Sequence, residues 1–116
     1  MEDRELLELA AKACGFELRF IALTNMPGAE ERSRIVHENG VTEKWNPLED
    51  DGDAFRLAAY LRLEVIPGKH AGDGCSVNSR RHEIPGVTVF RDSKDMAEQM
   101  RRAIVMAAAE IGKSIP

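Results

Sequence analysis

Three aspartates close together, Asp50, Asp51 and Asp53, are the residues of this sequence best suited to chemistry. Hard divalent cations prefer several carboxylate oxygens as ligands, so the cluster could hold the metal ion of a metal-dependent enzyme. The spacing does not fit an EF-hand loop, because Ala58 stands where that loop requires its last glutamate if Gly52 takes the central glycine position. A metal site is therefore one hypothesis, and a structural role is the other.

The same aspartates stand where a helix is expected to begin, which favours the structural role. Asn46 can cap a helical turn, and Pro47 suits a first helical position because no N–H is needed there. The helix dipole also favours carboxylates at this end. We expect a short turn over Pro47–Asp50 and a helix from about Asp51, with Asp50 or Asp51 as its cap. The predicted buried face of this helix holds Ala54, Leu57, Ala58 and Leu61.

Other residues with ligand or nucleophile chemistry are scattered along the chain. His37, His70, His82 and Cys75 lack the short pair spacings of zinc sites, so we predict no metal centre from them. Cys75 and its neighbour Ser76 also lack the second glycine of a nucleophile elbow. We expect no cofactor.

Arg80 and Arg81 are the centre of the only basic concentration in the sequence. They could contact a phosphate or an acidic partner, which makes a small nucleic-acid-binding regulator an alternative function. A net charge of −4 opposes a broad nucleic-acid surface, and short charge runs are usually solvated loops. The stretch Gly112-Lys113-Ser114 resembles part of a phosphate loop, but it ends a helix instead of opening one.

Composition limits the class of protein. A chain of 116 residues, 43% hydrophobic and 31% charged, is typical of one globular domain with a single core. The longest apolar run, Ala103–Ala109, is too short to cross a bilayer, and the first residues lack the features of a secretory signal. We therefore expect a cytoplasmic protein without membrane association. Cys14 and Cys75 are expected to be reduced thiols.

Hydrophobic periodicity predicts the elements that position these residues. Helices are expected over Asp3–Cys14, from about Asp51, and after a cap at Ser93. Strands are expected at Phe16–Leu23, Ser33–Glu38, Val41–Trp45, Leu63–Ile66, Cys75 to Ser79 and Gly86–Arg91. The order α-β-β-β-α-β-β-β-α indicates a single-domain layered α-β-α sandwich with an antiparallel or mixed sheet.

Two of these elements carry more specific predictions. The dipeptide Asn39-Gly40 is typical of a two-residue hairpin loop, which would pair Val36 with Glu43 and place His37 on the opposite face from Glu43. Trp45, the only tryptophan, is predicted to pack beside the helix that follows it. The run Ala103–Ala109 is apolar all round, so it must be covered on more than one side, by the sheet and by a neighbouring helix or another subunit. We predict that the chain self-associates through this helix.

The segments Trp45–Val65, Arg101–Ile115 and Asp3–Gly15 together resemble the bacteriophage ABA (alpha-beta-alpha) sandwich domain family. The sequences Trp-Asn-Pro-Leu and Asp-Asp-Gly-Asp carry the resemblance most specifically. It implies a small protein encoded by a tailed phage or prophage, with an α-β-α layered fold. It implies no activity and no catalytic residues.

The leading hypothesis is a phage- or prophage-encoded accessory protein that binds other proteins or itself. Its expected partners are further copies of the chain, as a homo-oligomer, or a phage or host protein. The alternatives are a metal-dependent enzyme that uses Asp50, Asp51 and Asp53, and a nucleic-acid-binding regulator that uses Arg80 and Arg81.

Overall fold

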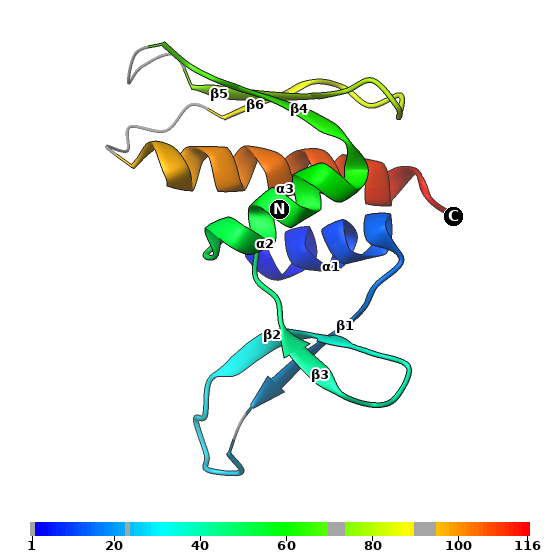
Figure 1. The fold of residues 1–116 in the computed structure, drawn as a ribbon. Coiled ribbons are helices and arrows are strands. Elements are labelled where there is room, and N and C mark those ends of the chain that lie inside the picture. The colour runs from blue at the N-terminus through cyan, green and yellow to red at the C-terminus, as the bar shows by residue number, and fades with distance from the viewer. Residues whose placement is uncertain (1, 23, 70–73, 90–94) are drawn as a thin grey trace.

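The computed structural model describes residues 2–22, 24–69, 74–89 and 95–116, and these residues form three helices and six strands (Figure 1). The elements in chain order are α1 (Asp3–Cys14), β1 (Glu17–Ala22), β2 (Glu31–Val36), β3 (Thr42–Lys44), α2 (Asp51–Leu61), β4 (Leu63–Pro67), β5 (Cys75–Ser79), β6 (Val87–Val89) and α3 (Met96–Ser114). This is the predicted order.

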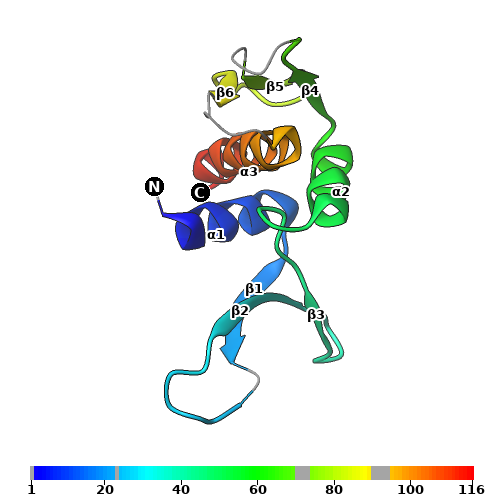
Figure 2. The ribbon, with the colours of Figure 1, turned by 90° about the vertical axis from the view of Figure 1, so that its left-hand side faces the viewer.

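The helices form the middle of the molecule, and two sheets lie on opposite sides of them (Figure 1, Figure 2). One sheet has the strand order β1-β2-β3 and the other β4-β5-β6, and all neighbouring strands are antiparallel. The predicted α/β class, element order and antiparallel pairing are confirmed. The layers differ from the predicted α-β-α order, since the helices form the middle layer and the strands are divided between two sheets.

Helices α1 and α3 pack side by side and make the most extensive contact between any two described elements. Each contributes small residues to the core, including Ala10 on α1 and Ala107 on α3, both with no exposed surface. Gly112 lies so close to α1 that a Cβ atom there would overlap the carbonyl oxygen of Leu9. The two helix backbones therefore approach each other more closely than larger side chains would allow.

The apolar run of α3 is covered within the chain itself. The residues Ala103, Val105, Ala107 and Ala108 have no exposed surface, since α1, α2 and the sheet β4-β5-β6 all contact α3. The predicted cover by a sheet and a neighbouring helix is therefore confirmed, whereas self-association through this helix stays a prediction. The sequence shows that such a helix needs several covering surfaces, and here one chain supplies them all.

Several local predictions lie at element ends. Gly15 adopts a left-handed conformation with φ of 74° and ends α1, as predicted. Asp95 caps α3 by accepting hydrogen bonds from the N–H groups of Ala97 and Glu98 at 3.0 and 3.3 Å. The predicted cap Ser93 lies outside the described residues. No helix in the described ranges is both long and apolar enough to cross a membrane.

Because Gly112 contacts α1, adding one methyl group at this position should lower the stability of the fold. Gly112→Ala should lower the free energy of unfolding by ~1–3 kcal/mol, because the new Cβ overlaps the Leu9 carbonyl and the helices must separate. Urea denaturation measures the change. Lys113→Ala, on the exposed side of the same helix, is the control. An increase in stability for Gly112→Ala, from better helix propensity, would contradict the close approach.

The two buried thiols predict that the stability of the fold depends on pH. Cys14 and Cys75 are free and buried. Loss of solvation on burial raises the pKa of Cys14 from 9.0 to about 12 and also raises that of Cys75. Because the unfolded thiol ionises first, the stability it contributes is present below pH 9 and falls as pH rises toward 12. Urea denaturation from pH 8 upward should show this fall, and Cys14→Ala should make it shallower. An equal slope in both proteins would contradict the assignment.

Candidate functional site

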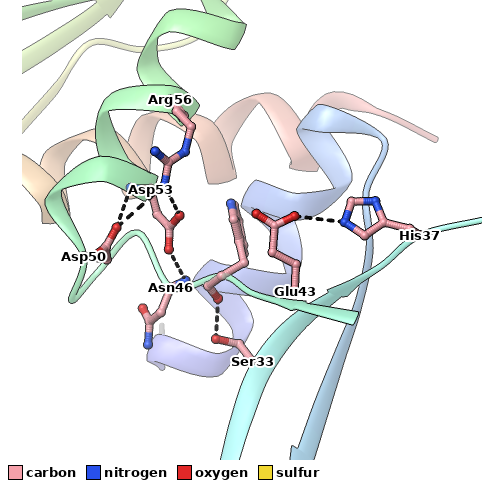
Figure 3. A network of polar contacts seen from close by, with 8 residues as sticks. Ser33, His37, Glu43, Asn46, Asp50, Asp53 and Arg56 are labelled. Atoms are coloured by element: carbon pink, nitrogen blue, oxygen red, sulfur yellow. Dashed lines mark hydrogen bonds and ion pairs between the residues drawn. The ribbon is translucent and has the colours of Figure 1, made fainter. Parts of the chain in front are cut away.

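The acidic cluster forms a polar network at the start of α2 (Figure 3). Asp50 has an extended backbone and caps the helix, because its carboxylate accepts a hydrogen bond from the N–H of Asp53 at 2.7 Å. A turn precedes it, in which the backbone carbonyl of Asn46 accepts hydrogen bonds from the N–H groups of Glu49 and Asp50 at 3.1 and 2.9 Å. The predicted turn, cap and helix start are confirmed.

Asp53 is a buried carboxylate with both oxygens occupied, and only 8% of the residue is exposed. One oxygen accepts a hydrogen bond from the backbone N–H of Asn46 at 2.9 Å, and the other binds the guanidinium of Arg56 at 2.7 Å. The hydrogen bond to Asp53 is the largest cause that raises the pKa of Arg56. Burial of this charge is tolerable because a cation and a backbone donor compensate it.

Asp51 points away from the other two aspartates. Its carboxylate binds the guanidinium of Arg101 on α3 at 2.6 Å, and Arg101 also donates from Nε to the carbonyl of Leu48 at 2.9 Å. The chain thus brings Asp50 and Asp53 together beside Arg56 but directs Asp51 toward α3. Among the described residues, no group of three or more His, Cys, Asp or Glu is arranged to hold a metal ion.

Asn46 and Trp45 join this network to the sheet β1-β2-β3. The side-chain oxygen of Asn46 accepts a hydrogen bond from the N–H of Leu48 at 3.1 Å, which fixes the turn. Trp45 is 6% exposed, its ring meets Phe16 edge to face at 6.2 Å, and its carbonyl accepts from the hydroxyl of Ser33 at 2.6 Å. The predicted burial of Trp45 is confirmed.

The hairpin differs from its prediction by one residue. Val36 pairs with Thr42 and Ile35 with Glu43, and the N–H of His37 donates to the carbonyl of Val41 at 2.9 Å. The loop between His37 and Val41 therefore has three residues and ends in Gly40, whose φ is 84°. This shift places His37 and Glu43 on the same face of the sheet, and the His37 ring lies 2.9 Å from the Glu43 carboxylate (Figure 3). The sequence analysis missed this pair because it assumed a two-residue loop.

A pocket of about 400 Å³ lies between this hairpin and α2, and we call it the Trp45 pocket. His37, Glu43, Arg56, Tyr60 and Trp45 are among its lining residues. A carboxylate that orients an imidazole is a common arrangement for a general base. Among the described lining residues, however, there is no serine, threonine or cysteine that such a base could activate.

A second, larger hollow of about 550 Å³ lies on the other side of α2, against β4 and α3, and we call it the α2–α3 groove. Its walls are mainly apolar and include Ala58, Leu63 and Ile104. Phe55 lies at this groove with 74% of its surface exposed. Sequence periodicity assigned only the buried face of α2, and Phe55 lies outside that face.

The other candidate residues do not join either site. Arg80 and Arg81 follow β5 in the opposite sheet, where Arg80 pairs with Glu64 at 3.1 Å. Cys75 has no exposed surface and a raised pKa, so it carries a neutral thiol rather than the thiolate that a nucleophile needs. His82 donates its N–H to the hydroxyl of Ser79 at the end of β5, in the other sheet from the hairpin of His37. His70 lies outside the described residues.

Comparison of the chain with models of protein families, with curated proteins and with solved structures finds no match in any of the three.

The capping role of Asp50 predicts a response that differs from that of a metal site. Asp50→Ala should lower the free energy of unfolding by ~0.5–2 kcal/mol, because the N–H of Asp53 loses its acceptor. Glu49→Ala, at an exposed neighbouring position, is the control. Millimolar Mg²⁺, Ca²⁺ or Mn²⁺ should shift the melting temperature no more than a salt control. A saturable rise that Asp51→Asn abolishes would overturn the structural interpretation.

Proposed function

We propose that this chain is a phage- or prophage-encoded accessory protein that works in the cytoplasm of the bacterial host by binding another protein molecule. The resemblance of its Trp-Asn-Pro-Leu and Asp-Asp-Gly-Asp segments to the phage sandwich family supports the setting. The α2–α3 groove supports the mode of action. We assign no catalytic step to the chain.

The observation that carries this proposal is the exposure of Phe55 at an apolar hollow. A phenylalanine that is 74% exposed leaves a large apolar surface in water, and here it adjoins a groove walled by Ala58, Leu63 and Ile104. Exposed apolar surface next to a concavity, with charged residues such as Asp51 and Arg62 at its margin, is typical of a protein-binding site.

The two alternative functions receive less support from the side chains they would use. A metal-dependent enzyme would need Asp50, Asp51 and Asp53 to converge on one ion. In this structure Asp50 and Asp53 are hydrogen-bonded at the helix start, and Asp51 binds Arg101. A nucleic-acid-binding regulator would need a concentration of free positive charge, but Arg80 is paired with Glu64.

Photo-crosslinking inside the bacterial host tests the proposal. Phe55 is replaced by p-benzoylphenylalanine, which keeps an aromatic side chain and reacts on irradiation with a protein that contacts it. We expect an adduct with a protein, identified by mass spectrometry. The matched control carries the same replacement at Tyr60, which is 59% exposed on α2 but lines the Trp45 pocket. No adduct at position 55, or equal adducts at both positions, would contradict binding through the α2–α3 groove.

A further inference from the structure

Four residues of α2 and its cap line the α2–α3 groove in a regular order. Asp51, Phe55, Ala59 and Arg62 all lie along it and are spaced by four, four and three positions. Residues three or four apart share one side of a helix, so they form a single stripe along α2. Figure 2 shows α2 at the flank of the helical layer, next to α3 and β4 and with no described element beyond it.

The stripe is self-complementary when a second copy of α2 runs in the opposite direction. Along α2 it reads acidic, large aromatic, small and basic, so a second α2 running in the opposite direction presents basic, small, large aromatic and acidic. In that pairing Asp51 lies opposite Arg62 of the second copy, and Phe55 lies opposite Ala59 of the second copy. A contact that uses the same patch on both molecules is the arrangement that twofold symmetry requires.

We propose that the molecule that occupies the α2–α3 groove is a second copy of this chain, bound through an antiparallel α2–α2 contact about a twofold axis. This inference rests on the proposed function, because it names the protein that the groove binds. Phe55 of each copy enters the groove of the other beside Ala59, and two symmetric ion pairs join Asp51 of one copy to Arg62 of the other.

The charges at both ends of the stripe are available for this contact. The side chain of Asp51 is 75% exposed, and its bond to Arg101 uses Oδ1 and leaves Oδ2 free to face solvent. Arg62 is exposed and makes no ion pair with the described residues. Exposed ion pairs contribute little energy but fix orientation, so Phe55 supplies the affinity and the charges select the antiparallel direction.

The run Ala103–Ala109 is buried within the fold except for the partly buried Met106, which leaves the groove side of α2 as the more suitable surface for self-association. Phe55 is among the most exposed large hydrophobic side chains of the described chain, and Ala59 next to it leaves room for a second aromatic ring. A different partner protein could use the same apolar surface. Such a protein is not expected to carry the same charges in the reversed order.

Charge reversal in two separate chains tests the contact. Arg62→Asp places two aspartates opposite each other in the symmetric dimer, and Asp51→Arg places two arginines opposite each other. We expect a dimer mass for the unmodified protein by light scattering, and at least a tenfold weaker association for either variant alone. An equal mixture of the two variants should recover the dimer, because each Asp then faces an Arg. The Arg62→Asp variant keeps the local backbone, because aspartate is compatible with the left-handed conformation of residue 62, whose φ is 54°.

Phe55→Ser and Tyr60→Ser provide a second, independent comparison. Phe55→Ser should abolish the dimer, and Tyr60→Ser, which changes the other side of α2, should leave it intact. Circular dichroism verifies that each variant is folded, and if Asp51→Arg does not fold, the Phe55 and Tyr60 pair decides. A monomer for the unmodified protein, or a dimer that tolerates Phe55→Ser, overturns the inference. A monomer that still gives a Phe55 adduct with a different protein leaves the proposed function standing, whereas a monomer without any adduct refutes both.

Discussion

The close contact between α1 and α3 is the constraint on which the rest of the structure depends. It exists because the two helices meet through alanines and through Gly112, where no side chain separates the α3 backbone from the carbonyl of Leu9. Two helices this close form one continuous apolar layer. On one side all three strands of the sheet β4-β5-β6 contact α3, and on the other side the sheet β1-β2-β3 meets α1 mainly through β1 (Figure 1). The fold is therefore a pair of small sheets held apart by helices, not one sheet with helices on it.

This arrangement explains which parts of the fold the sequence predicts well. Element type and order follow from local periodicity, and the buried face of α2 was predicted correctly because it repeats at helical spacing. The layer order depends on how many strands join each sheet, which periodicity does not encode. On α1 helical spacing predicts an apolar face of Leu6, Leu9, Ala10 and Ala13, but the buried residues are Leu6, Leu7, Ala10, Ala11 and Cys14. An alanine-rich contact has weak amphipathic contrast, so sequence alone fixes its direction poorly.

The candidate site also has a part that the sequence predicts and a part that it does not. The capping residues Asn46 and Asp50 were predictable because a cap is a local hydrogen bond between near neighbours. The pair of His37 and Glu43 was not, because it depends on whether the hairpin loop has two or three residues, and a change of one reverses the faces of a strand. Asn-Gly is compatible with both loops, since Gly40 adopts a positive φ in either. Only the pairing of the strands decides between them.

The two sides of α2 differ, because one side stabilises the fold and the other side is exposed. On one side, Asp53 accepts a hydrogen bond from the N–H of Asn46, next to the buried Trp45, which joins the helix to the end of the sheet β1-β2-β3, and substitution there costs stability. On the other side, Phe55 and Arg62 contribute little to the core and remain at the surface. Phe55 adjoins the apolar walls of the α2–α3 groove, and a contiguous exposed apolar surface of this kind is typical of a binding site. A helix fixed so firmly on its inner side presents its outer side as a rigid surface, and rigidity reduces the entropy lost on binding. In the proposed dimer the acidic cluster serves binding indirectly, because it holds α2 in the position from which Phe55 reaches the second copy.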